Sequence, residues 1–416
     1  MADTRARLQA LVQELIPLAE KYEEPAPGAF GIEDPLITKA KELIAQAQAP
    51  VDYATSLMVT TLEAISLRTL LQLNALQAIP ASGSISLTDF STKSGVQDSL
   101  LERLLRVPVN ANFIDQDSTS GEYSHTHLSQ GFTDPNSMPC RLFSFIYDEG
   151  LGGLMPLLPQ YLTHQHAQTG KWEEPGASRD STRFNIQTWH ANVEGVKTAF
   201  EVMEMNPERM KRFQTSMAIG EQLNPFVGYY NFDKLAVSSD EEEADRKALV
   251  DVGGGQGLAL AAILKAHPSL KPTHCVLQDT APVIALAQTS NPANLPPGIT
   301  YQPHDFFLAQ PILNAKAYYL KAIAHDLSDA NLVAVLRELV AVMAADSRAL
   351  IAENVLPERG GSGVMALMDL MMMGIGGKER TEEGFRRVLR QAGLVVDWVH
   401  RAGGGRNYAI VEARLE

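Results

Sequence analysis

Charged and polar side chains stand at the ends of successive apolar runs in the second half of the chain. Asp279, Asp305 and Lys321 end or follow three such runs, and His325 and Glu353 come next along the chain. The carboxyl ends of parallel strands meet at one edge of a sheet, which is where α/β proteins bind ligands. Carboxylates there can accept ribose hydroxyls, and an imidazole can take up a proton. The pattern therefore predicts one cleft that combines ligand binding with acid–base chemistry.

Four of these residues also have a purely structural interpretation. Asp279 and Asp305 are suitable caps for the helix or turn that follows them. His325 can be a surface histidine at a helix start, and Glu353 can be a surface acid, although two apolar residues precede it. Their recurrence at consecutive predicted strand ends favours the functional interpretation.

A glycine cluster follows the first of these apolar runs. The stretch 248–252 is apolar apart from Asp251, and a helix-forming stretch at 258–266 comes after the glycines. The glycines of the turn are Gly253, Gly254, Gly255 and Gly257. Strand, glycine turn and helix open a nucleotide-binding α/β unit, in which the backbone can approach a ligand closely. The spacing G-G-G-Q-G is neither the dinucleotide fingerprint nor a triphosphate loop. Asp251 stands where a carboxylate can receive an amine.

The elements that must position these groups alternate between strand and helix. Strands are expected near 249–252, 274–277, 299–302, 317–320 and 350–353, and helices near 258–266, 282–287, 329–344 and 382–392. Such alternation predicts an α/β fold with a doubly wound parallel sheet. The segments 394–399 and 408–411 predict a final antiparallel hairpin.

The first part of the chain has a different pattern. Helices are expected at 5–22, 37–47, 51–77, 88–94 and 99–107, followed by a hairpin around 115–121. Helices followed by a two-stranded wing describe a winged-helix domain, an architecture that often binds DNA. The bases Lys93, Arg103 and Arg106 are opposed by three acids within 84–107, so no basic recognition face is present. A role in dimerisation or in covering the substrate is the favoured interpretation. The polar stretch 165–181 is expected to be a surface loop, and 185–221 to be helical.

Composition limits the partners of the protein. The 416 residues are 45% hydrophobic and 20% charged, with a net charge of −14, which argues against a nucleic-acid partner. Cys140 and Cys275 lie far apart and give neither a metal-binding spacing nor a disulfide framework. Charges interrupt the N-terminal apolar residues, and no apolar run approaches the about 20 residues of a membrane helix. A cytoplasmic protein without membrane contact is expected.

Several ordered motifs resemble one family. The sequence D-V-G-G-G-Q-G at 251–257 resembles motif I of class I S-adenosylmethionine-dependent methyltransferases. The segment 325–329, His-Asp-Leu-Ser-Asp, looks like the H-D-W-S-D segment of plant and fungal small-molecule O-methyltransferases of the caffeic-acid type. The segments 352–357, Ala-Glu-Asn-Val-Leu-Pro, and 376–381, Gly-Gly-Lys-Glu-Arg-Thr, match two further motifs of that family. The resemblance implies a Rossmann-like methyltransferase domain at 149–416. It also implies a mainly helical winged-helix dimerisation domain at 1–148, and hence a homodimer.

The resemblance also implies a role for each matching residue. His325 corresponds to the general base, and Glu353 and Glu379 to the acids that flank it. S-adenosylmethionine is the implied cofactor, without a metal, and its implied binding residues are Asp251, Gly253, Gly254, Gly255, Gly257, Asp279, Asp305, Phe306 and Lys321. The implied acceptor-binding residues are Met217, Met368 and Met372.

The expected reaction is methylation of a hydroxyl, phenolic or N-hydroxyl, on a bulky apolar secondary metabolite of the fungal type. A phenol is mostly protonated at neutral pH, so a base that takes its proton as the new bond forms is worth about 10²–10⁴-fold in rate. Leu327 replaces the tryptophan of the family motif, so plant substrates are not assumed. Some proteins of this fold bind the cofactor and act as cyclases or pericyclases without methyl transfer. That alternative stays open, although His325 and both acids favour methyl transfer.

Overall fold

The computed structural model describes most of the chain as two compact units. One unit comprises Met1–Gly153 with Lys211–Leu223, and the other Leu154–Met210 with Asn224–Glu416. The described residues exclude Met1, 24–33, 176–185, 194–198, 211, 213–225, 244, 292 and 404–406. The domain boundary that the sequence suggests, between residues 148 and 149, stays a prediction.

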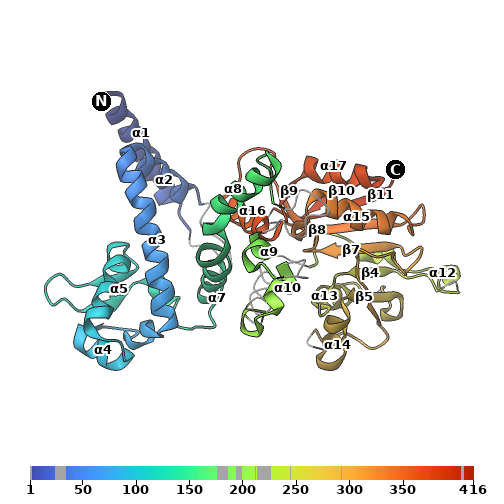
Figure 1. The fold of residues 1–416 in the computed structure, drawn as a ribbon, viewed down its shortest axis with the longest axis horizontal. Coiled ribbons are helices and arrows are strands. Elements are labelled where there is room, and N and C mark those ends of the chain that lie inside the picture. The colour runs from blue at the N-terminus through green and yellow to red at the C-terminus, as the bar shows by residue number, and fades with distance from the viewer. Residues whose placement is uncertain are drawn as a thin grey trace. The chain divides into compact units, whose positions relative to one another are not determined.

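Helices dominate the first unit (Figure 1). They are α1 (Ala2–Glu20), α2 (Pro35–Ala47), α3 (Pro50–Gln72), η2 (Ala75–Ala78), α4 (Leu87–Ser94), α5 (Asp98–Asn110), α6 (His127–Gln130), α7 (Met138–Phe145) and the π-helical η3 (Ile146–Leu154). Pro35 and Pro50 open α2 and α3 at a position where proline suits a helix, and Gly95 with φ of 70° ends α4. The predicted helix 51–77 is wrong at its end, because Asn74 is left-handed (φ 50°) and separates α3 from η2.

A small sheet completes the winged-helix arrangement that the sequence predicts. Its strands are β1 (Ser84–Ile85), β2 (Ile114–Gln116) and β3 (Tyr123–His125). They run in the order β1-β3-β2, and β3 pairs antiparallel with both neighbours. The buried side chains of Phe90, Leu101, Leu105 and Tyr123 join the sheet to α4 and α5 in one core.

The second unit is built on one mixed sheet with helices packed on it (Figure 1). Its strands are β4 (Leu249–Val252), β5 (Cys275–Asp279), β6 (Thr300–Pro303), β7 (Ala317–Lys321), β8 (Arg348–Leu356), β9 (Arg380–Thr381), β10 (Leu394–Arg401) and β11 (Tyr408–Leu415). The helices are η4 (Met155–Leu157), α8 (Leu158–Thr169), α9 (Ile186–Ala191), α10 (Ala199–Glu204), η5 (Phe232–Leu235), α12 (Ser239–Glu243), α13 (Leu258–Ala266), η6 (Pro272–His274), α14 (Ala281–Ser290), η7 (Ala324–Asp326), α15 (Asp329–Val340), α16 (Gly363–Ile375) and α17 (Glu382–Ala392). Two cores, one around Val250 and Phe385 and one around Leu249 and Tyr319, pack helices onto it.

The strand order contains a point where the direction of the chain reverses. The order is β10-β11-β8-β7-β4-β5-β6, with β9 beside β8. Strands β4 to β8 pair in parallel, and β10 and β11 form the antiparallel hairpin that the sequence predicts. The chain leaves β4 toward β5 and β6 and then returns to the other side of β4 as β7. Ligands bind where the direction reverses, at the carboxyl ends of β4 and β7.

Several predicted boundaries in this unit are wrong. The stretch expected to be helical at 185–221 is interrupted, because α9 ends at Ala191 and α10 ends at Glu204. The strand that holds Glu353 does not end there, because β8 continues to pair with Tyr408 of β11 and Arg380 of β9. The polar stretch expected to be a loop from 165 is helical up to Thr169, since α8 buries Gln165 and Tyr161 and ends only at Gly170 (φ 71°). The helix expected at 329–344 ends at Val340.

Among the described residues, no helix is both long and apolar enough to cross a membrane.

Candidate active site

The turn that carries His325 follows β7 and begins in a strained conformation. Ala322 has a φ of 53°, a left-handed conformation that costs an alanine roughly 1–2 kcal/mol. Its N–H donates to the carbonyl of Ala352 in β8 at 3.1 Å, which anchors the turn to the sheet. The buried Ala324 then opens η7, and His325 is its central residue. The backbone thereby turns the imidazole toward Glu353 of β8.

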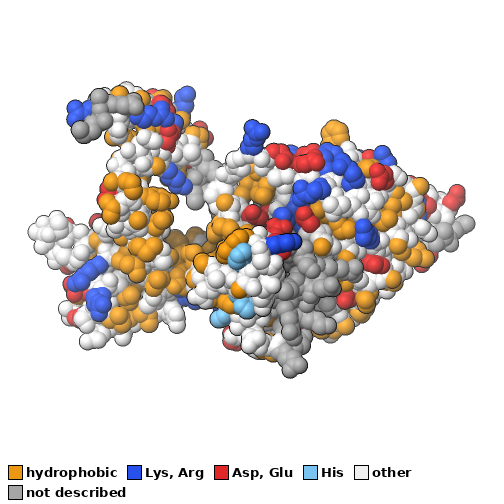
Figure 2. Space-filling model, turned by 45° about the horizontal axis from the view of Figure 1, so that its top comes forward, with side chains coloured by type: hydrophobic (Ala, Val, Ile, Leu, Met, Phe, Trp, Pro, Cys, Tyr) orange, Lys and Arg blue, Asp and Glu red, His pale blue; other side chains and the backbone are white. Residues whose placement is uncertain are grey.

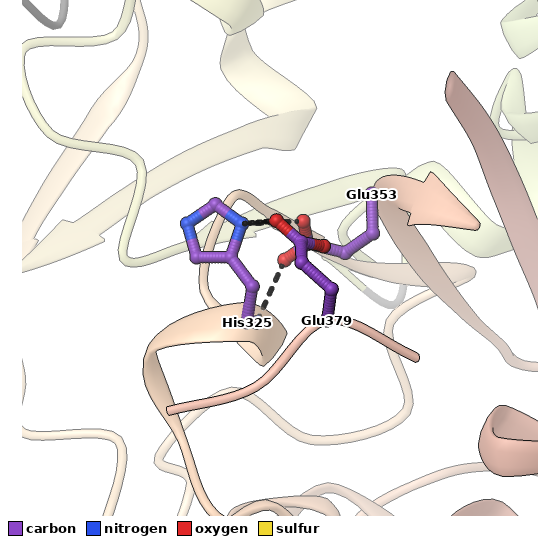
Figure 3. A group of neighbouring side chains, drawn as sticks. All are labelled: His325, Glu353 and Glu379. Carbon is purple, nitrogen blue, oxygen red and sulfur yellow. Dashed lines mark hydrogen bonds and ion pairs between the residues drawn. The ribbon is translucent and has the colours of Figure 1, made fainter. Parts of the chain in front are cut away.

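Two buried acids hold the imidazole (Figure 3). Glu353 from β8 lies 2.9 Å from Nδ1 of His325 through Oε2, while its Oε1 accepts the main-chain N–H of His325 at 3.1 Å. Glu379, next to β9, lies 3.8 Å from the same Nδ1 through Oε1. Both acids are almost fully buried, at 1% and 4% exposure. The structure therefore brings together the three residues predicted to be catalytic.

The opposite ring nitrogen faces a third carboxyl group. Nε2 of His325 lies 3.5 Å from Oδ1 of Asp326, and both side chains are about one-fifth exposed, unlike the buried acids. The ring thus turns Nδ1 to the protein interior and Nε2 to the more open side. Nε2 is therefore the ring nitrogen that is the more accessible to a ligand.

The three acids determine the protonation of the ring. Burial by itself would lower the pKa of His325, but the charges of Glu353, Asp326 and Glu379 outweigh it and raise the pKa to about 10. Burial raises the pKa of Glu379 to about 7 and that of Asp326 to about 6. The imidazole is therefore protonated at neutral pH in the free protein.

The glycine turn leaves no space for side chains beneath it. A Cβ on Gly254 would come within 2.4 Å of Oδ2 of Asp251, and one on Gly253 would come within 2.6 Å of Ile323. Asp251 is 1% exposed, and burial raises its pKa to about 7. Neither of its carboxylate oxygens has a hydrogen-bond partner among the described residues. By contrast, a Cβ on Gly255 would meet nothing within 4 Å, so the turn is open on that side.

The other residues predicted to bind the cofactor lie around this turn. Asp279 ends β5 and accepts the N–H of Gly255 at 2.9 Å, which fixes the turn, and burial raises the pKa of Asp279. Phe306 is near Gly253, 3.6 Å from the position of a Cβ there. Asp305 is exposed and accepts the N–H of Phe307 at 3.0 Å, as a turn-capping aspartate does.

Lys321 is the last residue of β7 and interacts electrostatically with Asp251, which precedes the glycine turn. Its charge acts on the buried Asp251 and lowers the pKa of that carboxyl, against the larger effect of burial. Its Nζ lies 4.8 Å from the ring centre of Phe226, a cation–π contact. Phe226 precedes the sheet outside any motif, so no pattern in the sequence singles it out.

Two of the three predicted acceptor-binding methionines are described. Met368 and Met372 are half-buried on α16, and Met217 lies outside the described residues. Helix α16 is joined to the histidine site by Asp369, whose Oδ1 accepts the N–H of Glu379 at 2.9 Å.

Sequence reasoning missed the supports of the His325 turn. A Cβ on Gly377 would come within 2.1 Å of the carbonyl oxygen of His325, so the segment before β9 lies directly against the turn. The N–H of Lys378 donates to that same carbonyl at 2.8 Å, and the buried Arg380 contacts the turn on both sides of His325. Both Gly377 and Arg380 belong to the motif at 376–381. The motif indicated the family, but it did not show that these two residues contact the His325 turn.

The same three side chains have the composition of a metal site. One ligand atom from each of His325, Glu353 and Glu379 lies within 4.8 Å of the others. A protonated imidazole between carboxylates also explains the cluster, since each acid contacts the ring directly.

Comparison with known proteins identifies the family. A family model described as an O-methyltransferase domain matches residues 179–395. The chain belongs to this O-methyltransferase family. Methyltransferase cfoD of Aspergillus candidus is 33% identical over 384 residues, which cover 90% of this chain and 90% of that protein. The cofactor of this chain is therefore S-adenosylmethionine, and its substrate is a small molecule.

Solved structures show the same fold over the whole chain. OxaC in complex with S-adenosylhomocysteine and oxaline is 27% identical, with a TM-score of 0.78 and coverage of 99% of this chain and 100% of that chain. A structure described as a pericyclic reaction enzyme has a TM-score of 0.74 at 24% identity, with 100% of both chains covered. The second likeness concerns the fold alone.

The residues at and around the glycine turn fit the cofactor of this O-methyltransferase. The turn is open at Gly255, Asp251 is buried and unpartnered among the described residues, and Asp279 and Lys321 stand at the neighbouring strand ends. A cationic, ribose-containing ligand suits this donor and acceptor set.

Proposed function

We propose that this O-methyltransferase methylates a hydroxyl group, phenolic or N-hydroxyl, of a bulky apolar secondary metabolite. The single observation that carries the proposal is the contact of His325 with Glu353 and Glu379 through Nδ1, which leaves Nε2 toward the more open side. S-adenosylmethionine supplies an electrophilic methyl on a sulfonium, so that the acceptor oxygen gains the methyl as the C–S bond breaks. His325 takes the hydroxyl proton on Nε2.

Glu353 and Glu379 support this transfer from the other side of the ring. Glu353 contacts both Nδ1 and the main-chain N–H of His325, so it fixes the ring orientation as well as the tautomer. Glu379 adds a second acid at 3.8 Å. A ring that accepts a proton on Nε2 becomes an imidazolium, and two neighbouring carboxylates stabilise that cation.

We assign the cofactor to the residues around the glycine turn. Asp251 and the glycines would hold the methionyl part, Asp279 the ribose, and Asp305 with Phe306 the adenine side, and Lys321 would be a further cofactor-binding residue. Asp251 supports this assignment because its buried carboxylate has no hydrogen-bond partner among the described residues. Such a group is costly unless a ligand or water completes its hydrogen bonds.

The acceptor is proposed to meet the methionines of α16. Met368 and Met372 are half-buried and flank Asp369, which is hydrogen-bonded to Glu379. Thioether side chains adapt to irregular apolar shapes, so they suit a bulky ring system. Met217 keeps its predicted role as a proposal based on sequence.

The oligomeric state is proposed to be a homodimer through the first unit. Helix α3 exposes apolar side chains along much of its length, including Val51, Met58 and Leu62 at 70%, 61% and 53% exposure. Hydrophobic side chains gather on this part of the surface (Figure 2). Large exposed apolar patches are typical of interaction sites.

A second candidate function is a cofactor-binding cyclase or pericyclase that does not transfer the methyl. The pericyclic reaction enzyme of the same fold favours it. His325 with its two acids favours methyl transfer, because a proton acceptor at this point is what an O–H nucleophile requires.

One experiment separates the candidates. The protein is incubated with S-adenosylmethionine labelled in the methyl group and a panel of phenols and N-hydroxy compounds. We expect transfer of label by the wild type and a loss of about 10²–10⁴-fold in His325→Ala. Transfer that persists unchanged in His325→Ala would rule out the base assignment, and product formation without label would establish the cyclase. A parallel sample treated with a chelator should retain full transfer, since the proposed reaction needs no metal.

A further inference from the structure

Arg380 is a buried arginine at the back of the histidine site. Its side chain is 1% exposed, and it lies in β9, where it pairs with Val355 of β8. Taking a guanidinium out of water is costly unless its N–H groups find partners. The partners of Arg380 therefore indicate what the residue does.

Its hydrogen bonds go to the two ends of the turn that carries His325. Nη1 donates to the carbonyl of Ala324 at 2.5 Å, and Nη2 donates to the carbonyl of Leu327 at 2.6 Å. Nη1 also donates to the carbonyl of Lys378 at 3.2 Å, within its own segment. The planar guanidinium thus spans η7 from its first residue to the residue just after it. A lysine offers no such fork, because its donors share one nitrogen.

A counter-charge orients this guanidinium. Nε of Arg380 donates to Oδ1 of Asp329 at 2.9 Å, at the start of α15. The exposed Arg387 contacts the other oxygen of Asp329 at 3.2 Å but no carbonyl of the turn. Burial lowers the pKa of Arg380, and Asp329, Glu353 and Glu379 counteract this effect. The two catalytic acids thus act on the guanidinium through their charge, whereas its hydrogen bonds go to the turn, to Asp329 and to Lys378.

The turn requires such a restraint. It starts at Ala322, whose left-handed φ of 53° is unfavourable for an alanine. The segment 377–380 also contributes the close contact of Gly377 and the N–H of Lys378, both on the carbonyl of His325. Glu379 belongs to this same segment. One short piece of chain thus fixes the position of the imidazole and of an acid that faces it.

We propose that Arg380 is the positioning residue of the active site, which clamps the turn at Ala324 and Leu327 and thereby holds Nδ1 of His325 against Glu353 and Glu379. This inference rests on the proposed function of His325 as the base. Arg380 touches neither the ring nor the proton, so it acts through His325. Its loss should lower kcat and leave cofactor binding unchanged, because Arg380 bonds to the turn at Ala324 and Leu327 and not at Ile323, which lies against the glycine turn.

The test compares Arg380→Lys with the matched control Arg387→Lys, which keeps a contact with Asp329 but has none with the turn. We expect kcat to fall about 10²-fold in Arg380→Lys, because a displacement of a reacting group by about 1 Å lowers the rate by about this factor. The cofactor Kd, measured by calorimetry, should not change in either variant. Guanidinium ion should restore part of the activity of Arg380→Ala, which a general loss of structure would not allow.

A second readout does not depend on turnover. The ring of His325, followed by NMR in labelled protein, should titrate with a pKa near 10 in the wild type and closer to the ordinary histidine value in Arg380→Lys. An unchanged titration together with an unchanged kcat would overturn the proposal, as would equal losses in Arg380→Lys and Arg387→Lys. If the wild type transfers no methyl, the proposed function fails while the titration still decides the positioning role.

Asp329→Asn covers the case in which Arg380→Lys does not fold. Without its counter-charge, the guanidinium should be drawn from the turn toward Glu353 and Glu379, with which it already interacts electrostatically. A lower kcat with an unchanged cofactor Kd supports the clamp. An unchanged kcat in a folded Asp329→Asn protein counts against it.

Discussion

Glu353 contacts His325 through two different atoms, and this double contact determines how activity should depend on pH. The acid raises the pKa of His325, which reaches about 10 against the opposing effect of burial. Only the deprotonated ring can accept a proton from the acceptor. The logarithm of kcat/KM should therefore rise with pH from neutrality until the ring loses its proton.

Replacing Glu353 with glutamine should shift this rise to lower pH. The amide removes a negative charge 2.9 Å from Nδ1, so the imidazolium is less stable and the pKa of His325 falls. The variant should have more neutral histidine at pH 7 but a weaker base and a less fixed ring, and its maximal kcat should fall about 10-fold or more. A pH profile of kcat/KM measures both effects.

Glu358→Gln is a suitable control for that profile. Glu358 follows β8 and accepts the N–H of Glu383 at 3.0 Å, away from the imidazole. Its profile should coincide with that of the wild type. A rise that stays at the same pH in Glu353→Gln would mean that Glu353 does not determine the protonation of the base.

At the scale of elements, the contact between the segment 377–379 and η7 is the tightest in the site. A methyl group on Gly377 would come within 2.1 Å of the carbonyl oxygen of His325 and 2.9 Å of the carbonyl carbon of Asp326. Both neighbours are backbone atoms, which cannot move aside like a flexible side chain. Gly377→Ala should therefore push the turn away from Glu379 and reduce kcat about 10²-fold.

Gly363→Ala provides the matched comparison. Gly363 is the first residue of α16, and a Cβ there would meet nothing within 4 Å. The same change should leave activity intact and add roughly 0.4–1 kcal/mol of stability by restricting the unfolded chain. Equal activity in the two alanine variants would show that the close contact at Gly377 has no role in positioning the base.

The sequence predicted the elements well where one physical signal dominates. The predicted helices 258–266 and 382–392 have the bounds of α13 and α17. Gly257 directly precedes α13, and α17 lies between the capping Thr381 and Gly393. The parallel strands β4, β5 and β7 were found because both of their faces are buried, so they are largely apolar runs. The predicted end of β8 was wrong because two polar residues, Glu353 and Asn354, interrupt the apolar run, and only pairing with β9 and β11 shows that the strand continues to Leu356.

The catalytic side chains of the histidine site could be predicted from the sequence, but the residues that hold the His325 turn in place could not. His325, Glu353 and Glu379 are marked by their residue types and motifs. The role of Arg380 depends on which carbonyls its side chain reaches, and only the folded chain brings Ala324 and Leu327 within its fork. The exposed position of Asp305 and the cation–π contact of Lys321 likewise depend on tertiary packing.

At the scale of the whole molecule, the first unit exposes apolar side chains of α3 that are not part of its core. The buried residues of the winged-helix core include Leu67 and Leu70 near the end of α3. Toward the start of the same helix, Tyr53, Leu57 and Met58 are 57%, 47% and 61% exposed. Apolar side chains of that size are stabilised when they are removed from water, and a second copy of the chain offers the same face.

Met58→Asp combined with Leu62→Asp should abolish such a dimer. The two positions are one helical turn apart, so both charges would be buried without partners in an interface on this face. In sedimentation, the wild type should have twice the monomer mass of 45.4 kDa, and the double variant the monomer mass itself. Leu313→Asp is the control, because Leu313 is 63% exposed in the second unit and should leave the mass unchanged. A wild type that sediments as a monomer would contradict the dimer, and a dimer that survives both charges would assign the contact to another face.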